Sequence, residues 1–268
     1  MSKITVFGGA GSIGSELVRQ LVKNNEVLIF DIDETRCYDL YEQLAQKEYK
    51  ISYRIGDVRN QDVVRAEIEH FQPDIIFHCA AYKHVSPMDK FPKEAVNTNI
   101  IGTLNILAAK HKNTKFINIS TDKVINANCV MGATKKVAEI IVKNAGGISV
   151  RFGNVMGSRG SVIPIWQDQI NRGEPLTITD PRMERYMMTI PQACELLIEA
   201  CQKGKGGQIW VMDMGEKINI LELAKKIVGN RNIKIKTIGI RPGETLDERL
   251  MTEEEQKVAV KKGNFWII

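Results

Sequence analysis

A glycine-rich loop between a short apolar run and a helix-length segment constrains the fold of this chain more than any other feature. Residues 8–14 read GGAGSIG, directly after Ile4–Phe7 and before Ser15–Asn24. Glycines at 8, 11 and 14 allow a tight turn, close approach of backbone N–H groups to a pyrophosphate, and close packing of helix on strand. The pattern predicts a dinucleotide site. The residues expected to form it are Gly8, Gly11, Ser12, Ile13 and Gly14.

Short runs rich in Val and Ile alternate with amphipathic segments through the first half of the chain. The expected strands are Ile4–Phe7, Glu26–Asp31, Ile51–Ile55, Asp74–His78, Lys115–Ile119 and Ile148–Phe152. The expected helices between them are Ser15–Asn24, Glu34–Gln46, Lys93–His111 and Met131–Asn144. Such alternation predicts repeated βαβ units, and hence an α/β fold with a Rossmann-type, doubly wound parallel sheet.

The rhythm changes after Phe152, where a loop leads into a less regular region. We expect residues 1–155 to form an NAD(P)-binding Rossmann domain and residues 156–268 to form mainly a smaller C-terminal substrate-binding lobe. Residues from about 186 to 213 combine a capped amphipathic helix with a strand-like run. We expect this part to return to the Rossmann sheet.

Asp31 ends the second expected strand, about 20 residues beyond the glycine loop. A carboxylate there accepts hydrogen bonds from an adenosine ribose and repels a 2′-phosphate, which favours NAD over NADP. Arg36 follows a few residues later, and a guanidinium can cover a phosphate. NADP therefore stays possible as the cofactor.

Composition excludes several other classes of protein. The net charge of +5 comes from scattered Lys and Arg, which does not indicate nucleic-acid binding and suits a small anionic ligand. The five cysteines include no C-x-x-C pair, so neither a disulfide framework nor a metal site is expected. The N-terminus leads straight into a strand-like run and no apolar run is long enough to span a membrane. We therefore expect a cytoplasmic protein without a membrane span.

Polar residues gather directly after the apolar run Phe116–Ile119, in the segment STDKVINANCVMGATK at 120–135. A buried strand that ends there would release these side chains into a cleft. Lys135 would lie one helical turn beyond Met131, on the same helix face. Met131 cannot carry a proton, because a thioether does not ionise.

Six segments are informative when they are taken together: GGAGSIG at 8–14, HCAAYKHV at 78–85, STDK at 120–123, MGATK at 131–135, RFGNVMGSRGSVIP at 151–164 and RPGE at 241–244. They resemble the extended short-chain dehydrogenase/reductases. More narrowly, they resemble the UDP-N-acetylglucosamine 4,6-dehydratases of surface-polysaccharide and flagellin glycosylation. Met131 stands where this family usually has the catalytic tyrosine. In one branch of these dehydratases, a methionine likewise replaces that tyrosine.

The resemblance implies a nucleotide-sugar 4,6-dehydratase that acts on UDP-N-acetylglucosamine through a 4-keto intermediate with internal return of a hydride. The implied catalytic residues are Thr121 at the carbon 4 hydroxyl, Asp122 as acid, Lys123 as base, Met131, and Lys135 at the nicotinamide ribose. Further implied cofactor contacts are Asp57, Val58, Ala80 and Ala81. The candidate contacts to the UDP-sugar are Lys83, His84, Asn154, Arg185, Arg241 and Glu244. Relatives often pair through the helices at 93–111 and 131–144, so a homo-oligomer is expected.

Several alternatives stay open at this point. The same fold and substrate would suit an epimerase or a reductase, and the missing tyrosine would suit a non-catalytic NAD-binding module. Asp122 could serve only as a turn cap, Met131 as a core methionine and Lys135 as a solvated helix residue. The first proton could pass to Asp122, to Lys123 or to a water held by Thr121.

Overall fold

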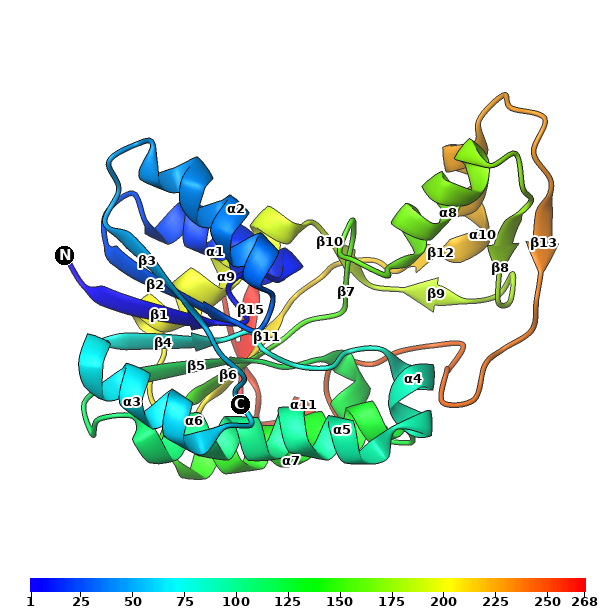
Figure 1. Ribbon diagram of the computed structural model, residues 1–268. Coiled ribbons are helices and arrows are strands. Elements are labelled where there is room, and N and C mark those ends of the chain that lie inside the picture. Colours follow the sequence, from blue (N-terminus) through cyan, green and yellow to red (C-terminus); the bar gives the residue numbers. More distant parts are fainter.

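A nine-stranded sheet forms the centre of the molecule in the computed structural model, which describes residues 1–268 (Figure 1). Its strand order is β14-β15-β11-β6-β5-β4-β1-β2-β3. The strands are β1 (Lys3–Phe7), β2 (Glu26–Asp31), β3 (Ile51–Ile55), β4 (Ile75–His78), β5 (Lys115–Ile119), β6 (Ile148–Arg151), β11 (Ile209–Met212), β14 (Val260–Lys262) and β15 (Phe265–Ile267). Those from β3 to β11 run parallel, and β15 and β14 continue the sheet antiparallel. The expected α/β fold with a Rossmann-type sheet is confirmed.

Helices cover both faces of this sheet (Figure 1). One face carries α1 (Ser12–Leu21), α2 (Glu34–Ala45) and α9 (Ile190–Lys203). The other carries α3 (Gln61–Phe71), α5 (Pro92–Val96), α6 (Gly102–Ala109) and α7 (Val130–Asn144), with the short α4 (Val85–Lys90) beside them. Strand β1 shows why both faces are covered: Ile4 and Val6 pack into one core, and Phe7 packs into the other. Because its side chains alternate between two buried faces, the strand is mainly apolar, with Thr5 as a buried polar residue.

The expected helix at 93–111 is not continuous. It is divided into α5, a π-helical turn η1 (Asn97–Ile101) and α6. The wider turn brings the Asn99 side chain to the backbone N–H and C=O of Tyr82, at 2.9 and 3.0 Å, and to the Thr134 hydroxyl at 3.1 Å. A π-turn therefore ties the loop after β4 to α7, as such turns often do near functional sites.

A smaller lobe stands beside the carboxyl ends of the strands (Figure 1). It contains α8 (Val162–Asn171), β8 (Leu176–Ile178), β9 (Glu184–Arg185), β12 (Ile218–Asn219), α10 (Ile220–Val228) and β13 (Ile235–Thr237). Its own apolar core surrounds Trp166, whose indole N–H donates to the carbonyl of Thr177 at 2.7 Å. The pair β7 (Asn154–Val155) and β10 (Met187–Met188) connects the lobe with the sheet.

Parts of the chain after residue 155 also lie with the main sheet. Helix α9 packs against α1, and β11 pairs with β6. The C-terminal strands β14 and β15 join the same sheet, although the sequence analysis placed them in the lobe region. Helix α11 (Glu253–Val258) precedes them. We propose that residues 156–189 and 213–250 make up the lobe. No helix combines the length and apolar composition that crossing a bilayer requires.

Candidate active site

The glycine loop has the shape of a dinucleotide cradle. Gly8 has φ +76°, and a Cβ there would lie 2.5 Å from the backbone nitrogen of Ala80. A Cβ on Gly14 would lie 2.1 Å from the carbonyl oxygen of Gly8. Helix α1 starts at Ser12 with no side-chain cap from Gly11, so its first N–H groups are available to an anion. The loop can make this tight turn and pack against Ala80 only because these positions lack side chains.

Asp31 is held beside this loop at the end of β2. Its carboxylate accepts hydrogen bonds from the N–H groups of Ala10 at 3.0 Å and Asp33 at 3.1 Å. Arg36 forms an ion pair with Asp33 at 3.0 Å instead of approaching Asp31. The arrangement leaves a negative charge where an adenosine ribose would bind, which suits NAD better than NADP.

The remaining cofactor candidates follow β3 and β4. Asp57 is bound by Arg59, with 2.6 Å between the guanidinium and the carboxylate, and its hydrogen bond with Arg59 lowers the pKa of Asp57. Val58 is buried in the core beneath α3. Ala80 approaches Gly8 through its backbone, and Ala81 follows it. Their contacts with a cofactor stay predictions.

Asp122 and Lys123 follow β5 in a short 3₁₀ turn whose N-cap is Thr121. The Thr121 hydroxyl donates to Asp122 Oδ1 at 2.8 Å, and Lys123 Nζ lies 3.0 Å from the same oxygen. The other oxygen, Oδ2, is buried and has no hydrogen-bond partner. Asp122 therefore does not act as the cap, and it retains an unused acceptor in a site that lines a cavity.

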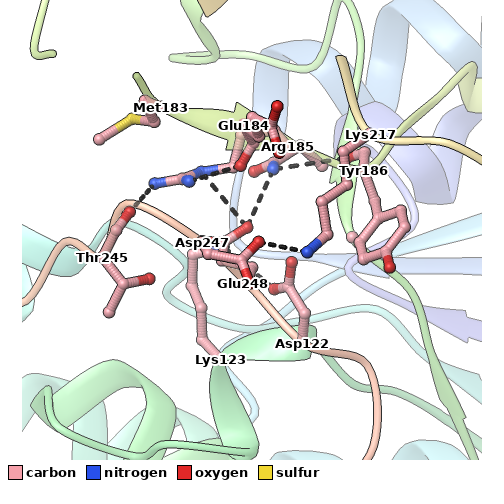
Figure 2. Close-up of polar contacts among 12 residues, drawn as sticks. Asp122, Lys123, Met183, Glu184, Arg185, Tyr186, Lys217, Thr245, Asp247 and Glu248 are labelled. Carbon is pink, nitrogen blue, oxygen red and sulfur yellow. Dashed lines mark hydrogen bonds and ion pairs between the residues drawn. The ribbon is translucent and has the colours of Figure 1, made fainter. Parts of the chain in front are cut away.

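Glu248 completes this charge cluster, and the sequence analysis missed it (Figure 2). Its carboxylate lies 2.9 Å from Lys123 Nζ, 3.3 Å from Arg185 Nε and 3.3 Å from Asn154 Nδ2. The only sequence signal was an acidic residue four positions after Glu244 in RPGETLDERL. Tertiary contact alone shows that it reaches Lys123.

The cluster separates the pKa values of its carboxyl groups. Burial alone would raise the pKa of Asp122, but the adjacent Lys123 and its hydrogen bonds lower that pKa overall. Burial and the Asp122 charge raise the pKa of Glu248. Burial opposes the charge on Lys123, yet the two carboxylates together raise the pKa of Lys123. Neighbouring titratable groups whose pKa values are shifted in opposite directions are typical of acid–base sites.

Lys135 and Met131 lie on the buried side of α7. Met131 is 3 % exposed and packs in a small apolar core with Met88, Ala95 and Cys129. Lys135 is 5 % exposed, and burial lowers the pKa of its ammonium to about 8. The structure thus places Met131 as a core methionine and excludes a solvated position for Lys135.

The candidate substrate residues line one cavity of about 620 Å³ between the sheet and the lobe. They share its wall with Asp122 and Lys123; they are Lys83, His84, Asn154, Arg185, Arg241 and Glu244. Burial lowers the pKa of Lys83 and, together with the charge of Lys83, that of His84. A cavity of this size fits a drug-sized ligand.

Arg185 and Glu244, like Asn154 and Lys83, already make hydrogen bonds within the protein. Arg185 donates to the carbonyls of Glu184, Thr245 and Leu246 and pairs with Glu248, so we correct its expected grip on a pyrophosphate to a role in holding the segment before Glu248. Glu244 accepts a hydrogen bond from the backbone of Arg241 at 3.2 Å, which closes the RPGE turn. The Arg241 side chain is the exposed cation of this turn.

Known proteins share this fold and much of this sequence. A family model described as "Polysaccharide biosynthesis protein" matches residues 4–268. The probable polysaccharide biosynthesis protein EpsC of Bacillus subtilis is 42% identical over 270 residues, which cover 94% of this chain and 45% of that protein. A UDP-glucose 4-epimerase of Rickettsia bellii is 35% identical over 283 residues, 99% of this chain and 82% of that protein.

Solved structures of other proteins share the fold of this chain. The structure of Pen from Bacillus thuringiensis matches with a TM-score of 0.94 at 38% identity, over 100% of this chain and 89% of that chain. DesIV, a dTDP-glucose 4,6-dehydratase from Streptomyces venezuelae crystallised with NAD, shares the fold with a TM-score of 0.82 at 20% identity, over 96% of this chain and 90% of that chain.

A Rossmann-type sheet, a glycine cradle and a charge cluster beside a cavity define the class as Rossmann-type α/β proteins, a fold that the chain shares with Pen. Within that class, the chain belongs to the polysaccharide biosynthesis protein family. It spans about half the length of EpsC.

Proposed function

We propose that this chain is an NAD-dependent nucleotide-sugar 4,6-dehydratase and that its substrate is UDP-N-acetylglucosamine. The observation that carries the proposal is the Asp122–Lys123 pair at the end of β5, where it faces the cavity between the sheet and the lobe. A dehydratase needs both an acid and a base at the sugar, and this pair supplies one of each. The chemistry that NAD contributes when bound is acceptance of a hydride from carbon 4 and its return to carbon 6.

Thr121 and Asp122 offer a route for the first proton in the absence of a tyrosine at 131. The Thr121 hydroxyl would bind the carbon 4 hydroxyl, and it already donates to Asp122 at 2.8 Å. A proton passed along this hydrogen bond leaves Asp122 protonated. Asp122 can then give that proton to the departing carbon 6 hydroxyl, which leaves as water.

Lys123 would remove the proton from carbon 5 and later return a proton there. Its pKa is raised by two carboxylates, which favours the charged form before reaction. Protonation of Asp122 in the first step removes one of these negative charges, so the pKa of Lys123 falls as oxidation at carbon 4 proceeds. Oxidation would thereby favour release of the Lys123 proton to solvent through the cavity, which leaves the neutral amine that elimination requires. Lys135 would hold the nicotinamide ribose.

The decisive test is the mass of the product. Purified protein is incubated with UDP-N-acetylglucosamine without added NAD(P)H, and the product is analysed by mass spectrometry. We expect loss of one water, and in deuterium oxide one solvent deuteron should appear at carbon 5. UDP-, GDP- and dTDP-sugars should be compared in parallel, and the bound cofactor identified after denaturation.

A UDP-sugar 4-epimerase is the second candidate, since the Rickettsia bellii relative with that name covers nearly the whole chain. An epimerase returns the hydride to carbon 4 and releases no water. A product of unchanged mass but altered chromatographic mobility would support this reaction and contradict the dehydratase.

A further inference from the structure

A loop from the cavity side reaches the dinucleotide cradle. Residues 156–161 follow β7 and precede α8, and Gly157 and Gly160 in this loop have φ of +74° and +69°. The backbone N–H of Arg159 donates to the Ser12 hydroxyl at 3.1 Å, and its Nη2 donates to the carbonyl of Ala10 at 3.3 Å. Arg159 thus spans from the lobe side of the molecule to the start of α1.

The guanidinium of Arg159 retains donors for another acceptor. Arginine carries five N–H donors, and the contact with Ala10 uses one of them. The structure shows no ion pair with Arg159, whereas Arg36 and Arg59 are paired with carboxylates. Among the hydrogen bonds of residues 8–14, Arg159 is the cationic side chain. An unpaired guanidinium beside free helix N–H groups is arranged to bind phosphate oxygens.

The same loop is held in place from the cavity wall. Lys83 donates to the Ser158 hydroxyl at 3.1 Å, and Ser158 donates to the carbonyl of Val155 at 2.8 Å. A Cβ on Gly160 would lie 2.3 Å from His84 Nε2, so glycine lets the loop pack directly on that ring. These contacts fix the backbone on both sides of Arg159 and direct its side chain toward the cradle.

We propose that Arg159 is a cofactor-binding residue that clamps the pyrophosphate of the dinucleotide from the cavity side, opposite the backbone N–H groups of α1. This inference rests on the NAD binding included in the proposed function, but not on the dehydratase reaction. Affinity for NAD would then depend on a loop that also forms part of the cavity wall.

The test compares the NAD affinities of purified variants by isothermal titration calorimetry after bound nucleotide has been removed. We expect Arg159→Ala to weaken binding about ten-fold to a hundred-fold, the range typical of charge-assisted hydrogen bonds. The NAD affinity of Arg159→Lys should lie between those of the wild type and Arg159→Ala, because an ammonium keeps the charge but loses the planar fork of donors. Arg172→Ala is the matched control, since Arg172 is an exposed arginine at the end of α8 paired with Asp168.

A second ligand shows where the clamp acts. ADP-ribose contains the pyrophosphate, so its binding should weaken as much as that of NAD; adenosine has no phosphate, so its binding should be unchanged in Arg159→Ala. Equal NAD affinity of the wild type and Arg159→Ala would overturn the proposal, as would equal losses for NAD and adenosine. A wild-type protein that binds no dinucleotide would overturn the cofactor assignment and this inference together, whereas NAD binding without loss of water from the sugar would overturn only the proposed reaction.

Discussion

At the scale of single residues, the charge of Lys123 is stabilised by two carboxylates, one adjacent in the sequence and one from a distant part of the chain. Asp122 is its neighbour in sequence, and Glu248 arrives from the segment after RPGE. Glu248 is itself oriented by Arg185 and Asn154. The activity should therefore depend on Lys123 itself and on the neighbouring Glu248.

Replacing Lys123 with alanine should reduce kcat for loss of water about 10²- to 10⁴-fold, because the general base at carbon 5 is lost. Stopped assays with mass spectrometric detection measure this. Lys112→Ala is the control, since Lys112 is exposed and lies before β5, at the opposite end of that strand from Lys123. Unchanged turnover in Lys123→Ala would contradict the mechanism.

Glu248→Gln should move the pH dependence of kcat. The Glu248 carboxylate helps to raise the pKa of Lys123, so its neutralisation lowers that pKa. A base is active when deprotonated, and the acidic limb of the profile should therefore shift to lower pH. Glu248→Asp should restore part of the wild-type profile. A limb that stays in place in Glu248→Gln would mean that Glu248 has only a structural role.

At the scale of elements, a buried ion network joins β6, α7 and α11. Arg151 is fully buried and pairs with Glu139 at 2.8 Å and with Glu255 at 2.8 Å, and it also donates to the carbonyl of Leu250. Glu139 accepts a hydrogen bond from Ser120 at 2.6 Å, at the start of the segment that carries Asp122 and Lys123. The network therefore anchors the C-terminal segment that carries Glu248 beneath the site.

Arg151→Ala should reduce the free energy of unfolding by about 3–5 kcal/mol, because it leaves buried carboxylates without their partner. Urea denaturation followed by circular dichroism measures the change. Arg172→Ala on the surface should change it by less than about 0.5 kcal/mol. A loss from Arg151→Ala no larger than that of the control would show that the network does not stabilise the fold.

At the scale of the whole molecule, α6 and α7 cover the face of the sheet opposite α1 and α9 (Figure 1). Their outer side leaves apolar side chains exposed. Leu104, Val137 and Ile140 are 40 %, 41 % and 51 % exposed. We predict that a second copy of the chain covers this face in a homo-oligomer, because apolar surface gains free energy when it is removed from water.

Ile140→Lys should shift the assembly toward monomer, since a charge in an apolar interface is costly to bury. Sedimentation velocity measures the distribution of species. Ile238→Lys is the matched control, because Ile238 is 44 % exposed and lies in the lobe. A wild-type protein that sediments as a monomer at all concentrations would contradict the prediction.

Local sequence patterns were enough to predict the parallel part of the sheet, the glycine loop and the polar segment that carries Asp122 and Lys123. Apolar strands, spaced glycines and polar residues at a strand end are visible over a few positions, and the parallel sheet brings such ends to one edge. The π-helical turn at Asn97–Ile101 escaped notice, because it depends on Asn99 reaching Tyr82 and Thr134.

Which charges meet depends on how remote segments fold together. The tertiary structure brought Glu248 to Lys123, turned Arg185 toward Glu248 and laid Arg159 on the glycine loop, across separations of 125, 63 and 149 positions in the sequence. It also placed Met131 in an apolar core and buried Lys135. The physical reason is that an ion pair or a buried position depends on distances in space, and a local sequence pattern carries no information on distances between remote segments.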